Sequence, residues 1–293
     1  MPPLTTLADP TRYFHRPIVA ALGVVSVILT AYVVWLTLRD VSLLRAGQDA
    51  FVGTANYVRL WNDPRAISAL VRTVFFMMLA TGIEVALGLA IVLFLDRNFA
   101  FKRLVRALLL VPIIMTPVVV GLTWRFIFDP ATGMANYSLS LLGLGPVDWL
   151  GSTDVALFSV LIADVWQWTP FVVLLVMAGL ESAPTDPMDA ARVDGAREWQ
   201  VTWYILLPML RRVLAVVALI RAIDSIKAFD LFYIMTRGGP ALSTETLNYY
   251  GYVAAFTNFD ISYALTIALV LTVFTNVALL TMYGVLFPKS GER

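Results

Sequence analysis

Six long apolar stretches restrict the fold of this chain more than any other feature. A helix needs about 20 mostly apolar residues to cross the hydrocarbon core of a bilayer. The segments that reach this length are Ile18–Leu38, Leu70–Leu95, Ala107–Phe128, Val155–Leu180, Val213–Met235 and Tyr263–Phe287. The composition agrees, since 59% of the 293 residues are hydrophobic and only 14% are charged. The sequence therefore predicts an integral membrane protein with six spans.

Each span is predicted to be an α-helix, because backbone polar groups in lipid must find their hydrogen-bond partners within the segment. A β-barrel would show short alternating stretches in place of these continuous apolar runs. Pro112, Pro117 and Pro170 lie inside spans and predict bends that face neighbouring helices. The expected fold class is all-α, with six transmembrane helices.

The distribution of Lys and Arg predicts the orientation, because cytoplasmic loops carry an excess of both. With six spans, one side of the membrane would carry 12 of these residues and the other side 7. The short loop Asp96–Arg106 is strongly basic. Both termini are therefore expected in the cytoplasm. No small-residue cleavage site follows the first apolar run, so this run is expected to be retained and not removed as a signal peptide.

Several classes of function are disfavoured by composition. The chain has no Cys and one His, His15, which argues against thiolate chemistry and Cys/His metal sites. The net charge of +1 gives no reason to expect nucleic acid as a partner. No GxxxxGK[ST] phosphate-binding loop is present, so ATP would have to be hydrolysed elsewhere. An intramembrane enzyme would need a concentrated catalytic constellation, which the scattered acids do not form. We expect no catalytic residue, cofactor or metal on this chain.

The most informative loop, Pro184–Arg212, separates the fourth and fifth spans. Its first residues fit a helix N-terminus: Asp186 can cap it, Pro187 suits the first helical position, and Asp189 suits the positive end of the helix dipole. Gly195 permits the left-handed turn that would end this short helix.

A second short helix is predicted after the turn, with Trp199 and Trp203 four residues apart on one face. Ala190 and Ala191 give one face of the first helix small side chains. Two short helices joined by a glycine turn could project from the membrane and insert into a groove on a partner. The alternative is an amphipathic hairpin that lies at the membrane interface.

The sequence DAARVDGA, which starts at Asp189, and the downstream pair Leu207-Pro208 closely resemble the signature loop of bacterial ABC importer permeases. In that family the loop reads Glu-Ala-Ala, three residues, Gly and a later Leu-Pro, and it docks on the ATPase subunit. Here Asp189 replaces the usual Glu, and Arg212 stands where many sugar permeases have a second Pro. The resemblance implies an ATPase-coupling role for Asp189, Ala190, Ala191, Asp194, Gly195, Ala196, Trp199, Trp203, Leu207 and Pro208.

A second resemblance follows the fifth span. Phe229-Asp230, the run to Gly238-Gly239-Pro240, and the segments Thr244–Leu247 and Tyr249–Phe256 look like the carbohydrate branch of that family, the maltose-type permeases. The Gly-Gly-Pro element is by itself a tight turn. The resemblance covers about residue 70 to the C-terminus and implies three parts. These are residues 1–69 (N-terminus, first span and outer loop), a five-helix permease core over 70–287 with the coupling loop 184–212, and a cytoplasmic tail over 288–293.

The same resemblance implies a mechanism and partners. An extracytoplasmic solute-binding protein would deliver the solute to a bacterial inner-membrane complex. Two ATPase subunits, which hold ATP and Mg, would drive this chain and a second homologous permease between alternating states. A self-standing secondary transporter is an alternative and predicts an internal inverted repeat, which the sequence does not reveal by inspection. A permease for a non-sugar solute is another. Hexose, disaccharide, polyol, glycerol phosphate and modified sugars all stay open as the solute.

Candidates for the substrate pathway lie in the fourth and fifth spans, since ionisable groups inside spans default to functional hypotheses. In the fifth span, Arg221, Asp224, Lys227 and Asp230 follow at intervals of three. They could face the solute, or form an ion-pair ladder that locks the helix to its neighbours.

The fourth span combines aromatic and hydrogen-bonding side chains, which suits a hydroxylated solute because rings cover its C–H faces. These residues are Asp164, Trp166, Gln167 and Trp168. The alternative is an aromatic belt at the membrane interface. Glu84 and Asn276 are lesser candidates that could equally link helices.

Overall fold

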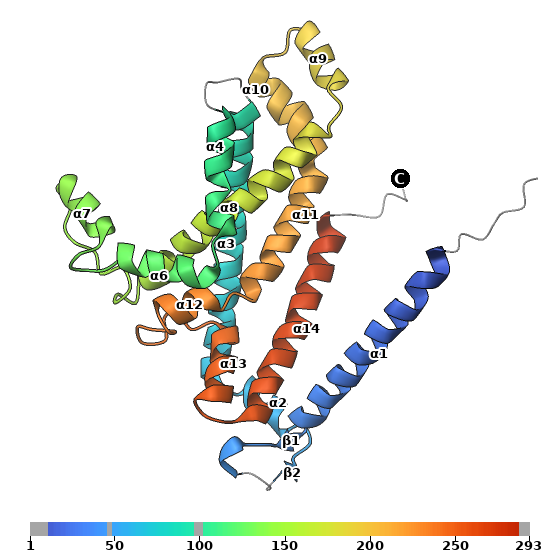
Figure 1. The fold of residues 1–293 in the computed structure, drawn as a ribbon, viewed down its shortest axis with the longest axis vertical. Helices are drawn as coiled ribbons and strands as arrows, with labels where there is room; N and C mark the ends of the chain where they lie inside the picture. Colours follow the sequence, from blue (N-terminus) through green and yellow to red (C-terminus); the bar gives the residue numbers. More distant parts are fainter. Residues whose placement is uncertain (1–10, 46–48, 97–101, 287–293) are drawn as a thin grey trace, which may run out of the picture. The chain divides into compact units, whose positions relative to one another are not determined.

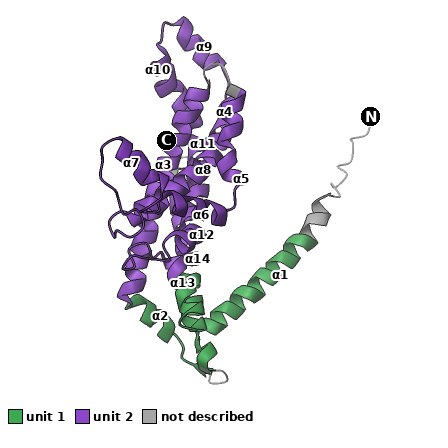
Figure 2. Cartoon of the chain, turned by 60° about the vertical axis from the view of Figure 1, so that its left-hand side comes forward, with its two compact units in different colours: residues 1–62, 251–270 green, residues 63–250, 271–293 purple. Residues whose placement is uncertain are grey.

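The computed structural model of the protein describes residues 11–45, 49–96 and 102–286, most of which are helical. Figure 1 shows the elements in chain order. They fall into two compact units (Figure 2). Unit 1 comprises residues 1–62 with 251–270, and unit 2 comprises residues 63–250 with 271–293.

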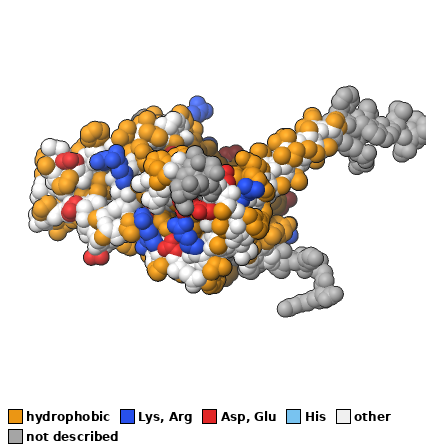
Figure 3. All heavy atoms as spheres, turned by 90° about the horizontal axis from the view of Figure 1, so that it is seen from below, with side chains coloured by type: hydrophobic (Ala, Val, Ile, Leu, Met, Phe, Trp, Pro, Cys, Tyr) orange, Lys and Arg blue, Asp and Glu red, His pale blue; other side chains and the backbone are white. Residues whose placement is uncertain are grey.

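The first helix of unit 1, α1 (Thr11–Thr37), is apolar along most of its length. No residue of its apolar 18-residue stretch is buried inside the structure, although Thr37 at the end of the helix is buried, and hydrophobic side chains cover its visible side in Figure 3. An apolar surface of this size needs lipid or another protein against it.

A small hairpin follows α1 in unit 1. Strand β1 (Arg39–Asp40) pairs antiparallel with β2 (Ala50–Phe51). The Ser262 hydroxyl donates to the Leu36 carbonyl at 2.9 Å and accepts from the Val41 N–H at 3.0 Å. These bonds tie the end of α1 to a segment more than 200 residues later in the chain. The other elements here are η1 (Leu43–Arg45), α2 (Ala55–Trp61), the end of α13 (Leu247–Phe256) and the start of α14 (Ile261–Leu286).

Three helices form the centre of unit 2: α3 (Pro64–Asp96), α8 (Ala156–Glu181) and α11 (Leu207–Ile226). Glycine brings them close together. A Cβ added to Gly88 of α3 would lie 2.5 Å from a side chain of α8, and one added to Gly179 of α8 would lie 2.8 Å from a side chain of α11. Such small-residue contacts are typical of helix packing in membranes.

The predicted third span, Ala107–Phe128, is not one straight helix. Helices α4 (Lys102–Leu109) and α5 (Val111–Ile114) are followed by α6 (Pro117–Ile127) after a bend of 101°. Proline disfavours helical backbone in the residue before it, and Thr116 accordingly has φ −68° and ψ 145°. The bend expected at Pro117 is confirmed, whereas Pro170 lies inside the single helix α8. Helix α7 (Met134–Leu141) follows α6 in the chain.

The predicted fifth span, Val213–Met235, is shifted. A helical run from Glu198 to Ile226 contains α10 (Glu198–Val201), a π-helical turn η2 (Thr202–Leu206) and α11. The wider π turn accommodates Pro208, which lacks an N–H. The run ends at Lys227, whose carbonyl accepts a 2.7 Å bond from the Asn248 side chain. A separate short helix, α12 (Asp230–Met235), follows.

Five described helices are long and apolar enough to span a membrane, or six if the bent pair counts as one span. The all-α prediction is confirmed. The predicted first, second, fourth and sixth spans correspond to α1, α3, α8 and α14, although α1 and α3 begin earlier than expected. The predicted boundary between residues 69 and 70 falls inside α3. The tail 288–293 and the loop residue Arg97 lie outside the described residues.

Candidate functional site

A buried ionic cluster joins the three central helices of unit 2. Arg221 of α11 is 1% exposed, and its guanidinium donates to both carboxylate oxygens of Glu84 on α3, at 2.5 and 2.8 Å. It also donates to Asp164 of α8 at 3.1 Å, and it stacks 4.8 Å from the ring centroid of Trp168. A charge in this environment is tolerated because it is paired and hydrogen-bonded.

The ion-pair ladder predicted along the fifth span is therefore present only in part. Arg221 forms its ion pairs with acids on other helices. Glu84 therefore links two helices, which is one of the two roles predicted for it. Lys227 and Asp224 form the remaining ladder pair at 3.6 Å, and both side chains are partly exposed. Asp230 lies outside α11, because it begins α12. Sequence reasoning missed the joining of Arg221 to Glu84 and Asp164, which is a tertiary contact.

A cavity of about 290 Å³ opens beside this cluster. Six of the predicted pathway residues line it: Asp164, Gln167, Trp168, Asp224, Lys227 and Asp230. The Gln167 side chain is 1% exposed, and its amide nitrogen donates to the Met115 carbonyl at 3.2 Å. Its oxygen is buried without a hydrogen-bond partner among the described residues. The cavity combines aromatic rings, carboxylates and a free acceptor.

The other two predicted pathway residues lie elsewhere. Trp166 does not line this cavity, and its ring contacts Trp124 edge to face at 5.9 Å between centroids. It lines a mostly apolar cavity of about 420 Å³. Asn276 is exposed on α14 and donates to the Thr272 carbonyl of its own helix at 2.8 Å. The structure therefore does not bring these two residues to the Arg221 cluster.

Of the two predicted short helices, the first is present as α9 (Asp186–Val193), at the top of Figure 1, whereas the second, α10, continues through η2 into α11. Gly195 joins them with φ +88°, as the glycine predicted. The expected capping by Asp186 is wrong: the helix already begins at Asp186, after Thr185, and no side-chain cap bond forms. Proline at the second position fits this start, since the N–H it lacks would be unsatisfied there.

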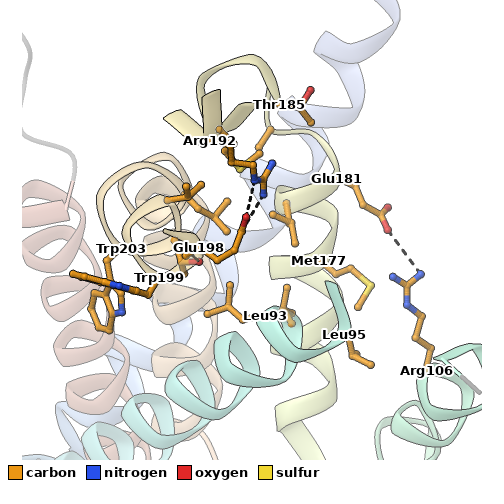
Figure 4. Close-up of a pocket in the computed structure, with 17 residues that line it drawn as sticks. Leu93, Leu95, Arg106, Met177, Glu181, Thr185, Arg192, Glu198, Trp199 and Trp203 are labelled. Atoms are coloured by element: carbon orange, nitrogen blue, oxygen red, sulfur yellow. Dashed lines mark hydrogen bonds and ion pairs between the residues drawn. The ribbon is translucent and has the colours of Figure 1, made fainter. Parts of the chain in front are cut away.

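A surface ionic cluster holds α9 and α10 together. Arg192 donates to Glu198 at 2.9 Å and to Asp189 at 2.8 Å, and Figure 4 shows Arg192 facing Glu198. These two acids raise the pKa of Arg192, Glu198 contributing more, so its charge is fixed at physiological pH. Trp199 and Trp203 are 53% and 64% exposed. The carboxylates Asp189 and Asp194 are exposed on this loop, whereas the two tryptophans line a cavity between the loop and the ends of α3 and α8.

The inner side of the loop packs against the central helices. Met188 of α9 is buried in a cluster with Val92, Val176 and Leu210, which lie on α3, α8 and α11. The small residues Ala191 and Ala196 pack against the same cluster, whereas Ala190, Asp194, Gly195 and Pro208 are exposed and Leu207 is half-buried. The face with the small residues therefore turns partly inward, and Met188 joins α9 to the apolar cluster that the three central helices share.

A cavity of about 770 Å³ lies between this loop and the ends of α3 and α8. Its apolar lining includes Leu95 and Leu206. At its edge, Arg106 of α4 stands 4.0 Å from Glu181 of α8 (Figure 4). The loop therefore rests on the membrane helices over an incompletely filled space.

The Gly238-Gly239-Pro240 element forms the expected tight turn, with Gly238 at φ +78°. Glu245 nearby is fully buried, and both its carboxylate oxygens accept bonds from Arg65, at 2.8 and 2.7 Å. Its backbone carbonyl accepts a 2.9 Å bond from Arg72. Sequence reasoning noticed Glu245 only as part of a motif. The pairing could have been suspected from Arg65 and Arg72, two cations near the start of an apolar helix that need acidic or carbonyl partners.

Comparison with known proteins agrees with this geometry. The trehalose/maltose transport system permease protein MalF of Thermococcus litoralis is 36% identical over 74% of this chain and 75% of its own length. A probable ABC transporter permease protein of Sinorhizobium fredii is 36% identical over 89% of this chain and 85% of its own length. The structure also resembles a chain of a bacterial ABC transporter for the acidic polysaccharide alginate, with a TM-score of 0.77, 18% identity and coverage of 96% and 99%.

The family model for binding-protein-dependent transport system inner membrane components matches residues 64–291, from the first residue of α3 onward. This range contains both ionic clusters, the α9–α10 loop and both cavities. The chain belongs to this family, whose members are the permease subunits of ABC transporters.

Proposed function

We propose that this chain is the permease subunit of an ATP-driven importer that carries a sugar or sugar-like solute across a bacterial inner membrane. The observation that carries the proposal is the two-sided construction of the α9–α10 loop. Its exposed carboxylates Asp189 and Asp194 are available to a partner, while Met188 is buried in an apolar cluster to which α3, α8 and α11 also contribute. A partner that binds the outer side can therefore move all three helices.

The partners follow from this role. Two ATPase subunits hold ATP and Mg and dock on the loop 184–212, and a second homologous permease completes the pore. An extracytoplasmic solute-binding protein delivers the solute. Both termini lie in the cytoplasm, in accord with the basic loops. This chain hydrolyses no ATP itself.

The sugar assignment rests on relatives and on the smaller cavity. Trehalose and maltose are named for a relative that is 36% identical to this chain over 222 residues. The cavity places Trp168 and Phe229 beside Asp164 and Gln167, and rings with convergent polar groups suit a hydroxylated solute. These residues, with Asp224, Lys227 and Asp230, form the solute pathway.

The test reconstitutes this chain with the permease and ATPase subunits that are encoded next to it in the genome. ATP hydrolysis is measured with and without the binding protein. The variant is the double charge reversal Asp189→Lys with Asp194→Lys, which reverses two exposed charges of the loop and removes the Asp189 partner of Arg192. We expect assembly or binding-protein-dependent hydrolysis to be lost.

A matched control carries the same charge change in another exposed segment, Asp148→Lys with Asp154→Lys, and should assemble with the ATPase. If the loop variant assembles and couples like wild type, or the chain never associates with an ATPase, the importer proposal is wrong. A self-standing secondary transporter would then be the leading account.

A further inference from the structure

The cavity of about 290 Å³ beside the Arg221 cluster has an uneven charge balance. Both cations that line it are engaged. The Arg221 guanidinium donates to Glu84 and Asp164, and the Lys227 ammonium lies 3.6 Å from the Asp224 carboxylate. A negatively charged solute would find no uncommitted cation among the described residues that line this cavity.

Carboxylates outnumber the cations. Asp164, Asp224 and Asp230 line the cavity, and Glu84 stands directly behind Arg221. Asp230 is exposed, and no ion pair among the described residues involves it. An anion that enters the cavity would lose its hydration and would be repelled by the carboxylates. Both effects raise the free energy of binding.

A second observation concerns hydrogen bonding. The Gln167 oxygen is buried without a partner among the described residues and belongs to a side chain that lines the cavity. A buried acceptor left unpaired costs free energy, so it favours a ligand that brings a donor. A sugar hydroxyl supplies one. Neutral and anionic sugars both carry hydroxyls, so this observation favours a hydroxylated solute, and the charge balance is what separates the two classes.

We propose that this cavity is a charge filter in the solute pathway, which admits uncharged, hydroxyl-rich solutes and rejects sugars with an anionic group. The inference rests on the proposed function and narrows its substrate class to neutral sugars and polyols, against glycerol phosphate. The fold alone imposes no such choice, since a transporter with this fold imports an acidic polysaccharide. The discrimination between neutral and anionic solutes is assigned to Asp224 and Asp230, the two acids of the cavity that lie outside the Arg221 cluster.

The first test measures the local potential without any solute. Because the chain has no cysteine, Ala228→Cys places its sole thiol in the cavity lining, and Ser138→Cys is a control on exposed, uncharged α7. In the assembled complex, the modification rates by cationic and anionic methanethiosulfonates are compared. We expect the cationic-to-anionic rate ratio to be about tenfold higher at position 228 than at position 138.

Adding Asp224→Asn and Asp230→Asn should lower the ratio at position 228 several-fold and leave the ratio at 138 unchanged. Equal ratios at the two positions, or no response to the double substitution, would overturn the charge filter.

The second test measures uptake into proteoliposomes of the neutral sugar and of its uronate, each at a saturating concentration of loaded binding protein. The Asp224→Asn, Asp230→Asn variant should raise uronate uptake relative to neutral uptake several-fold. An unchanged ratio with intact neutral uptake refutes the filter alone. A loop variant that assembles and couples ATP hydrolysis like wild type in the experiment above refutes the importer itself, so the two failures can be told apart.

Discussion

Two arginines of this chain each hold two carboxylates, in opposite surroundings. Arg221 and its partners Glu84 and Asp164 are at most 4% exposed, whereas Arg192 and its partners Asp189 and Glu198 are 44% to 75% exposed. The distances are similar, so burial is the difference. A buried pair is costly to break because it leaves an uncompensated charge, whereas an exposed pair returns to water. The buried cluster therefore fixes helix packing, and the exposed one stays available to a partner.

The largest expected effect is that of Arg221→Met, which leaves two carboxylates buried without a cation. We expect a loss of about 3–5 kcal/mol in the free energy of unfolding, measured by SDS titration in mixed micelles. Adding Glu84→Gln and Asp164→Asn to this variant should recover part of the loss. No recovery would mean that Arg221 acts through packing on Trp168 and not through charge.

Removing one carboxylate at a time should give a graded result. Glu84 accepts two bonds from Arg221 and Asp164 accepts one. We expect Glu84→Gln to lower stability by about 1.5–3 kcal/mol and Asp164→Asn to lower it by less. The same SDS titration ranks the two variants, and the reverse order would show that Asp164 is the principal partner.

The exposed region should depend more on its backbone than on its ion pairs. Gly195 has φ +88°, and its site has open space for a Cβ, so Gly195→Ala tests conformation alone. We expect a local cost of roughly 1–2 kcal/mol, seen as faster hydrogen exchange in α9 and weaker ATPase coupling. Gly82→Ala is the control, because Gly82 is helical and also has open space around it. Equal behaviour of the two variants would contradict a role for the left-handed turn.

The smallest expected effect is that of Arg192→Met on global stability. Its ion pairs are solvent-exposed and screened by salt, so the SDS unfolding midpoint should not change measurably. The difference between Arg221→Met and wild type should persist at 1 M salt, since buried pairs are screened much less. A clear loss of global stability in Arg192→Met would remove the distinction between the two clusters.

The sequence anticipated the elements of the candidate site better than their contacts. The left-handed turn at Gly195 was predictable because glycine adopts positive φ at little cost. The pairing of Arg221 with Glu84 was not, since the two residues are 137 positions apart and helical spacing offered Asp224 as a nearer partner. Likewise, Ala191 could have faced a partner, but it packs on the protein's own core.

Hydropathy in the sequence determined that this is a helical membrane protein, because lipid leaves the backbone no other partners. The prolines and Gly195 determined where helices bend or end, because those effects are local. Tertiary structure alone decided which charges are buried, where the fifth helix ends and which polar residues share a cavity. Those outcomes depend on side chains that meet across helices distant in the sequence, and no local periodicity encodes which faces come together.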